Sequence, residues 1–358
     1  MLYFRTKNIV LGKSNRKGFV TLLKYALPLL LGFYLLWHFY SAMDKPTREV
    51  FFKAVKEANY FWIILSLLIG LVSYFIRAYR WKYLLEPVGL KPKFWHRYHA
   101  LMIGYIVNLV VPRAGEATRA ALLYRTDKIP FAKSFGTIIG ERVFDLIMLG
   151  LVFLVAMFMS WQDIFTLKDI ITGNDVNTVG SSDGASWGKW VFIAMFGVLV
   201  LMVFLFYKIE LLRTKISSFF KEVMAGVLGI LKSKNPFAFI FYTVLIWVLY
   251  LVFFGICFFA FEETSDFPIA GVFIGFIAGT IGIMFTNGGI GAYPYLVGVV
   301  VTFYIGDQFD SQAAADGIGK ALGMIIWLSQ TIGVIILGLI SLAFLPRNYK
   351  KEKHDKPE

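Results

Sequence analysis

The stretch NLVVPRAGEATRAALLYR, residues 108–125, places charged side chains directly after an apolar run. Pro112 removes a backbone donor and favours a helix break or a helix start at this point. Most of the residues after it are good helix formers, so Arg113, Glu116 and Arg119 are expected at helical positions i, i+3 and i+6, along one stripe. The stripe carries one net positive charge, and its guanidinium groups suit a phosphate. Its meaning depends on whether the surrounding chain is embedded in a membrane.

The composition indicates a polytopic membrane protein. Hydrophobic residues make up 58% of the 358 residues and charged residues only 16%, against about 45–50% and about 25% in soluble chains. The mean hydropathy is +0.67. Several apolar runs have the length of about 17–25 residues that crosses a bilayer. The clear runs are 22–40, 60–76, 143–160, 190–207, 237–260 and 319–345.

The charges orient these spans. Six Lys and Arg residues fall in each of the segments 1–24, 77–97 and 208–234, whereas 261–267 and 306–316 contain three acids each and no base. Lys and Arg accumulate on the cytoplasmic side of membrane proteins, so both termini are predicted to be cytoplasmic. Topology therefore accounts for the net charge of +13, and nucleic-acid binding is not expected. No cleavable signal is evident, and the first apolar run is expected to be a retained helix.

Two regions, 98–142 and 268–305, are less regular and rich in Gly, Pro, Asn or charge. The orientation requires that 98–112 enters from the cytoplasmic face, breaks at Pro112 and returns through 113–130. It also requires that 268–305 goes in and comes back as a full or partial hairpin. Broken helices of this kind build the binding sites of transporters.

The predicted fold is thus an all-α membrane helix bundle with about six full spans and two broken or re-entrant regions, about eight spans in total. Residues 1–345 are expected to form one integral membrane domain. Residues 346–358 are expected to be a basic, disordered cytoplasmic tail.

A second charged motif, IIGERVFDLIML at residues 138–149, opens an apolar span. Glu141, Arg142 and Asp145 share one helix face, so Arg142 can pair with either acid. Both charged motifs have a simple reading at the membrane interface: an amphipathic helix for the first and snorkelling side chains for the second. The alternative is that the two rows face each other inside the bundle, where each offsets the charge of the other.

The third motif is TNGGIGAYPY, residues 286–295, at the tip of the second irregular region. Its glycines allow positive φ and close backbone approach, so the loop either presents amides to a phosphate or serves close helix packing. It lacks the GK[ST] ending of a nucleotide-binding loop. The candidate loop residues are Pro112 and Gly115 from the first motif, and Asn287, Gly288, Gly289, Gly291 and Tyr293 here.

The remaining polar residues give no further site. His96 and His99 lack a nearby acid or thiol that would complete a zinc site, so no metal is expected, and no cofactor is expected either. Cys257 is the single cysteine and cannot form an internal disulfide. Lys320 is expected to be an interfacial or paired lysine.

The three motifs in this order resemble the flippase-like transmembrane domain of the lysylphosphatidylglycerol synthases. The matching residues are Asn108, Pro112, Arg113, Gly115, Glu116 and Arg119, then Glu141, Arg142 and Asp145, then Gly288, Gly289 and Gly291. Asn287 stands where the family usually has proline, and the acid that often follows the glycines is absent. No aminoacyl-transferase domain follows residue 345, so lysylphosphatidylglycerol synthesis itself is not expected. The resemblance implies translocation of a polar-headed lipid between leaflets.

The leading hypothesis is therefore a lipid flippase or transporter in a bacterial or archaeal cytoplasmic membrane. Asn108 and the two charged rows would line a polar cavity and hold an anionic or phosphate-bearing headgroup. One alternative is an enzyme that transfers a group to or from a lipid-linked phosphate. The other is a membrane scaffold or a secondary transporter for a small anion. The sequence does not indicate an oligomeric state.

Overall fold

The computed structural model describes residues 30–160, 163, 166 and 235–345. Helices are the only regular elements in these ranges, so the predicted all-α polytopic bundle is confirmed. Four helical segments there are long and apolar enough to cross a membrane: Tyr60–Val88, Phe131–Met159, Pro236–Ala260 and Gln312–Phe344. The predicted span 190–207, the basic segment 208–234 and the tail 346–358 lie outside the described residues.

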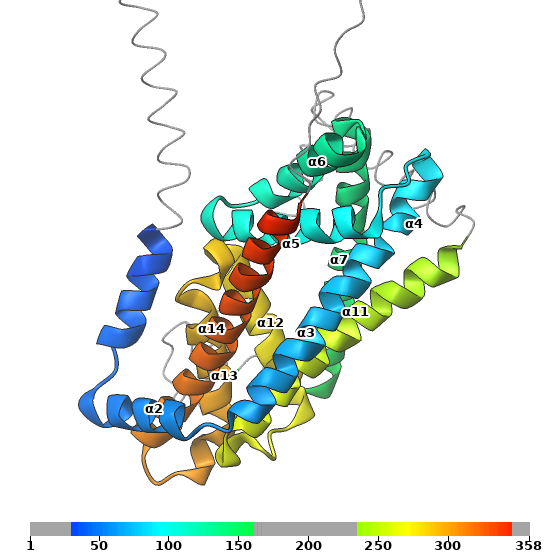
Figure 1. Ribbon diagram of the computed structural model, residues 1–358. Helices are drawn as coiled ribbons and strands as arrows, with labels where there is room; N and C mark the ends of the chain where they lie inside the picture. Colours follow the sequence, from blue (N-terminus) through cyan, green and yellow to red (C-terminus); the bar gives the residue numbers. More distant parts are fainter. Residues whose placement is uncertain (1–29, 161–162, 164–165, 167–234, 346–358) are drawn as a thin grey trace, which may run out of the picture.

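The two ends of the bundle are distinguished by the helices that lie across them (Figure 1). The α6 end carries α4 (Lys82–Leu85), η1 (Glu86–Val88), α5 (Phe94–Val110) and α6 (Ala114–Asp127). The α2 end carries α2 (Lys45–Glu57), η3 (Cys257–Ala260), η4 (Glu262–Thr264) and η6 (Gly306–Gln308). The long helices between the ends are α3 (Tyr60–Arg80), α7 (Phe131–Met159), α11 (Pro236–Ile256), α12 (Ile269–Phe285), α13 (Ala292–Ile305) and α14 (Gln312–Phe344).

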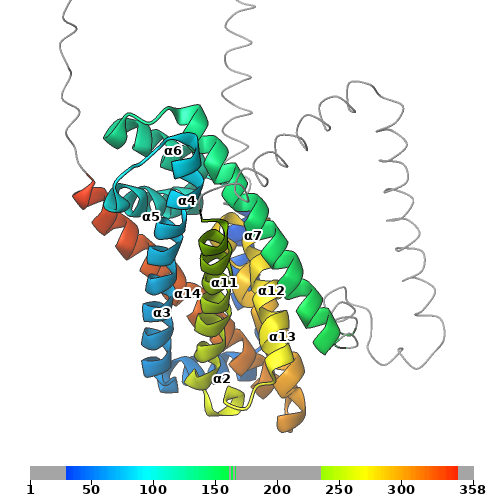
Figure 2. The same ribbon diagram turned by 90° about the vertical axis from the view of Figure 1, so that its right-hand side faces the viewer.

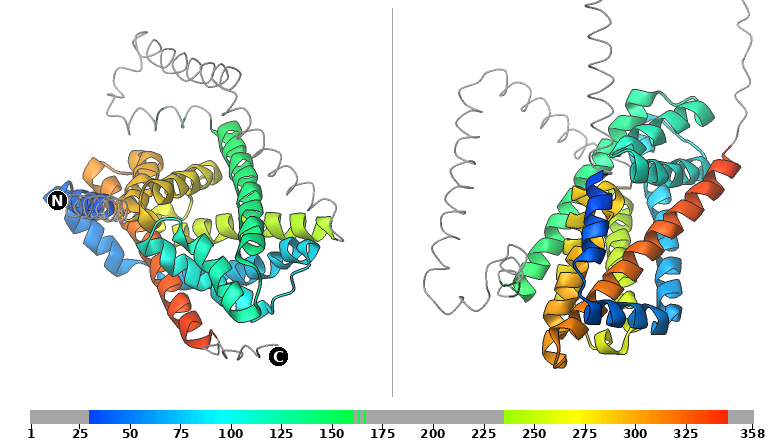
Figure 3. Two further views of the ribbon diagram at one scale, coloured as in Figure 1. Left: turned by 90° about the horizontal axis from the view of Figure 1, so that it is seen from above. Right: turned by 90° about the vertical axis from the view of Figure 1, so that its left-hand side faces the viewer.

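This arrangement groups the basic segment 77–97 with the C-terminal end of α14, and the acidic segments 261–267 and 306–316 at the opposite end. Figure 2 shows α7 along one side of the bundle, with α3, α11 and α12 next to one another. Residues 30–41 form a further helix, which approaches α12 and α13 from the side opposite α11 (Figure 3). Which end of the bundle faces the cytoplasm stays a prediction.

The first irregular region is a helical hairpin, α5–α6, with its break at residues 111–113. The break at Pro112 was predicted, but the hairpin lies across the α6 end more than along the bundle axis (Figure 1). Its two helices approach closely because each contributes a glycine at the crossing, Gly104 in α5 and Gly115 in α6. A Cβ atom on Gly115 would lie 2.1 Å from the carbonyl oxygen of Gly104.

The second irregular region is the predicted hairpin, formed by α12 and α13 with η5 (Asn287–Gly289) at its tip. The two helices have 17 and 14 residues, which corresponds to about 25 and about 21 Å of length. The tip therefore lies well inside the bundle. There the side-chain amide of Asn287 donates to the carbonyl of Val110 at 3.4 Å, so the tip meets the end of α5.

Two helix boundaries differ from the prediction in ways that matter for the site. The predicted span 60–76 excludes Arg77 and Arg80, whereas α3 includes both and ends at Arg80. The predicted span 143–160 starts late, because α7 begins at Phe131. Glu141 consequently lies about 15 Å inside a helix rather than at its start, and the helix dipole has no part in its placement.

Candidate functional site

The inner face of α3 supplies two buried arginines. Arg77 is 5% exposed and Arg80 is fully buried. They continue the buried positions of this helix, which recur every three or four residues: Ile63, Ser66, Gly70, Ser73, Arg77 and Arg80. Sequence reasoning missed both arginines because the span was ended at the first charge. The continued spacing was the signal that could have found them.

Glu141 of α7 is the centre of the charged cluster and is fully buried. Its Oε1 accepts from Arg77 Nε at 2.7 Å and lies 3.3 Å from Arg80 Nη2. Its Oε2 accepts from Arg119 Nη2 of α6 at 2.9 Å. Three helices are thus joined through one carboxylate, and the predicted pairing between the first and second charged motifs is confirmed for Arg119.

Asp145 lies one turn further along α7 and shares the same arginines. It accepts from Arg77 Nη2 and from Arg80 Nη2, the latter at 3.1 Å. Arg142 reaches Asp145 at 3.5 Å and donates to Glu116 Oε1 of α6 at 2.6 Å. The Arg142 side chain is 40% exposed, whereas the Asp145 side chain is 13% exposed. The cluster therefore runs from a buried centre at Glu141 to an accessible edge at Arg142.

Four guanidinium groups share three carboxylates in this network, which leaves one positive charge unbalanced. Neutral groups support the arginines: Arg77 Nη1 donates to Tyr250 at 2.9 Å, Arg80 Nη1 donates to Thr243 at 3.0 Å, and the Arg119 guanidinium stacks on Trp81 at 4.1 Å. Buried charges persist only when they are paired and hydrogen-bonded. The network meets this condition for Glu141 and Asp145, but not for Glu116 Oε2 or for all of its N–H groups.

Several buried donors of the network have no hydrogen-bond partner. They are Nε of Arg80 and both Nε and Nη1 of Arg119. Arg119 is only 2% exposed, so bulk water does not solvate these groups. An unpaired buried donor is costly, and an anion or an ordered water is the partner that such groups require.

Arg113 does not join the predicted stripe. α6 begins at Ala114, and Arg113 precedes it in the left-handed region with a φ of 60°. Its side chain is exposed and makes no ion pair among the described residues. The expected i, i+3, i+6 row is therefore wrong at its first member, while Glu116 and Arg119 both face α7.

Asn108, Pro112 and Gly115 shape the turn between α5 and α6. The Asn108 side-chain oxygen accepts from the backbone N–H of Gly115 at 2.7 Å. The amide of Asn108 thus satisfies the start of α6 and is a structural contact rather than a lining of the cluster. This bond and the glycine crossing hold α6 in the position from which Arg119 reaches Glu141.

The glycine motif serves packing in this structure. Gly288, Gly289 and Gly291 all have positive φ, and a Cβ atom on Gly291 would lie 2.5 Å from the backbone nitrogen of Leu36. The carbonyl of Gly288 accepts from Trp327 of α14 at 2.8 Å. The backbone amides of Gly289, Ile290 and Ala292 all donate within the loop, to Thr286, Asn287 and Ile290. The loop therefore joins the first helix, α5 and α14, which is the packing alternative rather than an amide cradle.

Tyr293 at the start of α13 is buried against the glycines of α12. A Cβ atom on Gly279 would lie 2.6 Å from its ring, and one on Gly282 would lie 2.8 Å from its backbone. Among the described residues, no hydrogen bond or ion pair links Tyr293 or the glycine loop to the four arginines. The ion-pair network is thus formed by the first two motifs together with Arg77 and Arg80, without the glycine loop.

Two cavities lie beside the network, but no network residue lines them. One, of about 190 Å³, lies between α3, α11 and α14. The other, of about 400 Å³, lies between α7 and α12 and is lined almost entirely by apolar side chains. In this conformation the two charged rows contact each other directly through ion pairs, and the expectation that they line an open polar cavity stays a prediction.

Two polar pairs lie outside the network. His96 contacts Asp127 at 2.9 Å, and Lys320 lies 3.2 Å from Asp316, the pairing expected for this lysine. No group of three His, Cys, Asp or Glu that could hold a metal ion occurs in the described part of the chain.

Comparisons with known proteins identify the family. The family model described as lysylphosphatidylglycerol synthase TM region matches residues 25–305. The UPF0104 membrane protein MJ1595 of Methanocaldococcus jannaschii is 26% identical over 149 residues, which cover 37% of this chain and 43% of that protein. A UPF0104 membrane protein of Methanothermobacter thermautotrophicus is 23% identical over 318 residues, 78% of this chain and 86% of the relative.

A shorter match connects the chain with a glycosyltransferase. Glycosyltransferase AglD of Haloferax volcanii is 36% identical over 80 residues, 22% of this chain and 13% of AglD. No solved structure matches the chain significantly. Because the family model covers more than half of the chain, the protein belongs to the lysylphosphatidylglycerol synthase transmembrane-region family.

Proposed function

We propose that this protein moves a phosphate-bearing lipid between the leaflets of the cytoplasmic membrane, and that the arginine–carboxylate network binds the headgroup. The observation that carries the proposal is the unbalanced guanidinium in a network that opens at Arg142. A lipid phosphodiester carries one negative charge. Its binding would neutralise the network and supply acceptors for donors that now have none.

The geometry supports an exchange of ion pairs. Arg142 holds Glu116 by a single contact at 2.6 Å and is 40% exposed, so a phosphate can reach it from outside the bundle. Guanidinium binds phosphate in the same forked geometry in which it binds a carboxylate. A headgroup that replaces Glu116 at Arg142 would then lie on the side of α6 that bears Arg119. In this step one anion replaces another at Arg142, so the guanidinium is never left without a counter-ion. The free-energy cost of the step is therefore low.

The test is lipid transfer by the purified protein in liposomes, followed with a fluorescent phosphatidylglycerol and a reductant that quenches only the outer leaflet. Replacing Arg142 with Gln removes a contact of about 1.5–3 kcal/mol, so transfer should fall by on the order of tenfold or more. Arg142→Lys should give an intermediate rate, because it keeps the charge but loses the fork. Lys91→Gln, at an exposed position of the same end, is the control. Equal transfer by Arg142→Gln and the wild type would contradict the assignment.

The match to AglD favours a second candidate, a part in group transfer on a lipid-linked phosphate. The network argues against covalent chemistry at this site, because Glu141, Asp145 and Glu116 are all held by arginines and none is placed as a free base. This candidate would be favoured if a lipid-linked sugar phosphate gave a new product in the presence of the wild type and none with Glu116→Gln.

A further inference from the structure

A second feature of the bundle is the cavity of about 190 Å³ between α3, α11 and α14. It lies near the middle of the long helices, since Gly70 is the central residue of α3 and Gln330 is close to the centre of α14. Most of its lining is apolar, but Ser66, Tyr74 and Gln330 also line it. Polar side chains at this depth are unfavourable in hydrocarbon and are therefore signs of function.

Among the polar side chains that line this cavity, the Ser66 hydroxyl accepts from the Cys257 thiol at 3.2 Å, whereas one donor, on Gln330, has no partner. The Nε2 atom of Gln330 is buried and has no hydrogen-bond partner, and the same holds for the hydroxyl of Tyr105. Tyr105 contacts Tyr74 with ring centroids 5.4 Å apart. Amide N–H and phenol O–H groups pair with groups that only accept, such as phosphate and ester oxygens. A buried donor in this setting is stabilised when such an oxygen reaches it.

The cavity is connected with the arginine–carboxylate network along α3. Ser66, Gly70, Ser73 and Arg77 follow one another on the buried face of this helix, and Tyr74 lies one turn from Arg77. Arg77 belongs to both regions, because its Nε and Nη2 contact the carboxylates and its Nη1 donates to Tyr250 of α11 at 2.9 Å. Small and polar side chains therefore continue from the network to the bundle centre without a break on this face.

We propose that the cavity between α3, α11 and α14 is a second binding site for the phosphate and ester oxygens of the same lipid, occupied midway between the leaflets. The proposal rests on the proposed function and adds the route of the lipid headgroup. This route follows the contact between α3 and α14, which we call the seam of α3 and α14. The seam is narrow at its core, where a Cβ atom on Gly333 would lie 3.3 Å from Leu67. Leu68 and Ile336 at the cavity are exposed and would face the acyl chains.

Filling the cavity tests the route. Gly70 lines the cavity and a Cβ atom there meets no atom within 4 Å, so the side chain of Gly70→Leu begins in open space and takes up cavity volume. Gly136 of α7 is equally free of neighbours but lies on an exposed surface, so Gly136→Leu is the matched control. We expect transfer by Gly70→Leu to fall by on the order of tenfold, as for loss of a charged headgroup contact, with the control unchanged. Wild-type transfer by Gly70→Leu would overturn the route.

A binding measurement decides the site independently of transport. A photoreactive phenylalanine analogue is placed at Val334, which lines the cavity, or at Ile332, which is exposed two residues earlier on the same helix. In phosphatidylglycerol liposomes, Val334 should be crosslinked to the headgroup and glycerol of the lipid, and Ile332 to acyl carbons. Acyl carbons at both positions would overturn the second site even if the protein moves lipid. If the wild type moves no lipid, the proposed function fails. The crosslink still shows whether the headgroup or the acyl chains of the lipid occupy the cavity.

Discussion

Glu141 is the residue on which the cluster depends most, because three arginines from two other helices converge on its two oxygens. Glu141→Gln keeps the shape of the side chain but leaves Arg77, Arg80 and Arg119 with too few anions. Removal of one partner from a buried ion pair costs about 3–5 kcal/mol. We expect a decrease of that size in the free energy of unfolding, measured by denaturant titration in detergent. Glu263→Gln, an exposed acid of the α2 end, should change it by less than about 0.5 kcal/mol.

Arg113 allows backbone strain to be separated from charge. Its φ of 60° is unfavourable for a residue with a Cβ atom, and the left-handed conformation costs about 1–2 kcal/mol there. Both Arg113→Gly and Arg113→Ala remove the guanidinium, but only glycine relieves the strain. The free energy of unfolding of the Gly variant should therefore exceed that of the Ala variant by about 1 kcal/mol, measured by denaturant titration in detergent. Equal stability of the two would show that the turn relaxes in another way.

At the residue scale, the sequence predicted which charged residues pair better than it predicted which of them are buried. The pairing of Glu116 and Arg119 with the second motif followed from two oppositely charged rows beside apolar spans, and the structure contains it. Arg77 and Arg80 were not predicted, because a charge at the end of an apolar run usually marks the end of a span. Their burial depends on α7 and α11, which supply Glu141, Thr243 and Tyr250 from far along the chain.

The α5–α6 hairpin positions Arg119, and its crossing tolerates no side chain. With a Cβ atom 2.1 Å from the carbonyl oxygen of Gly104, Gly115→Ala must push the helices apart. We expect a loss of about 1–3 kcal/mol of stability from this overpacking, together with reduced lipid transfer. Gly136→Ala in α7 meets no atom and should stabilise the helix by up to about 1 kcal/mol. Similar stability changes in the two variants would contradict the tight crossing.

The α2 helix depends on its N-cap. Asp44 accepts from the backbone N–H of Thr47 at 3.0 Å, and the hydrogen bonds with Thr47 lower the pKa of Asp44 below its ordinary value of 3.8. The stabilisation by this carboxylate is thus fully present above pH 3.8 and is lost as the pH falls through the lowered pKa. We expect amide protection in α2, corrected for intrinsic exchange rates, to fall in that range.

Two variants check the cap. Asn also caps helices but does not titrate near this pH, so Asp44→Asn should remove the pH dependence and keep the protection. Asp44→Ala should lower the protection of α2 at every pH. A pH dependence that persists in Asp44→Asn would assign the change to another group.

Elements were predictable where hydrophobic length decided them. The spans that became α11 and α14 follow directly from apolar runs, and the α12–α13 hairpin follows from its glycine-rich tip between two acidic segments. α2 was not predicted, because its 13 residues mix charges and form too short an apolar pattern, although Asp44 and the following proline are a typical start signal. The packing role of the glycine loop depends on Leu36, Leu109 and Trp327, which no local pattern places there.

For the whole molecule, the two ends differ in the groups they present. The α6 end exposes Lys91, Lys93 and Arg125, and the α2 end exposes Glu262, Asp307 and Asp310, although α2 itself adds four basic residues there. The network lies near the α6 end and the cavity near the bundle centre, so a lipid that uses both sites in turn would move along the seam of α3 and α14. The direction of this route in the cell depends on which end is cytoplasmic.

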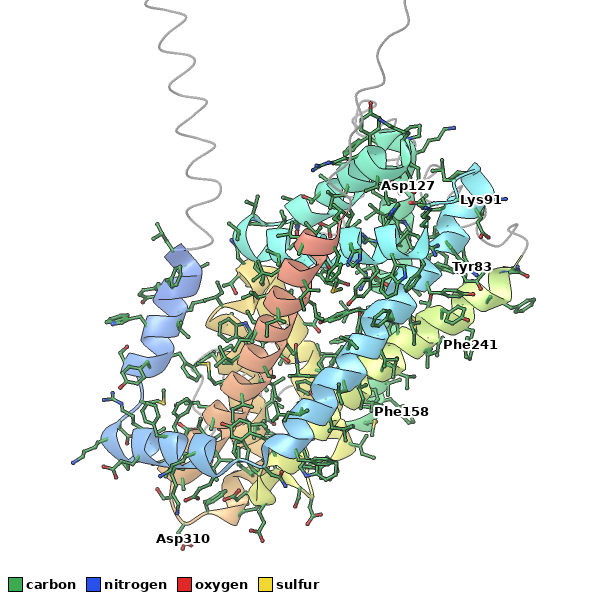
Figure 4. The ribbon with its side chains drawn as sticks, viewed as in Figure 1. Tyr83, Lys91, Asp127, Phe158, Phe241 and Asp310 are labelled. Atoms are coloured by element: carbon green, nitrogen blue, oxygen red, sulfur yellow. The ribbon has the colours of Figure 1, made fainter. Side chains whose placement is uncertain are left out.

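The positive-inside rule predicts that the α6 end is cytoplasmic. Lys91 and Asp310 lie at opposite ends of the molecule (Figure 4), and both are exposed. The single native cysteine, Cys257, is buried, so a thiol reagent reports on introduced cysteines with little background. In intact cells, a membrane-impermeant maleimide should label Asp310→Cys but not Lys91→Cys, and both should react after the membrane is opened. The reverse pattern would invert the molecule and place the arginine–carboxylate network in the outer leaflet, where the headgroup would then be received from outside.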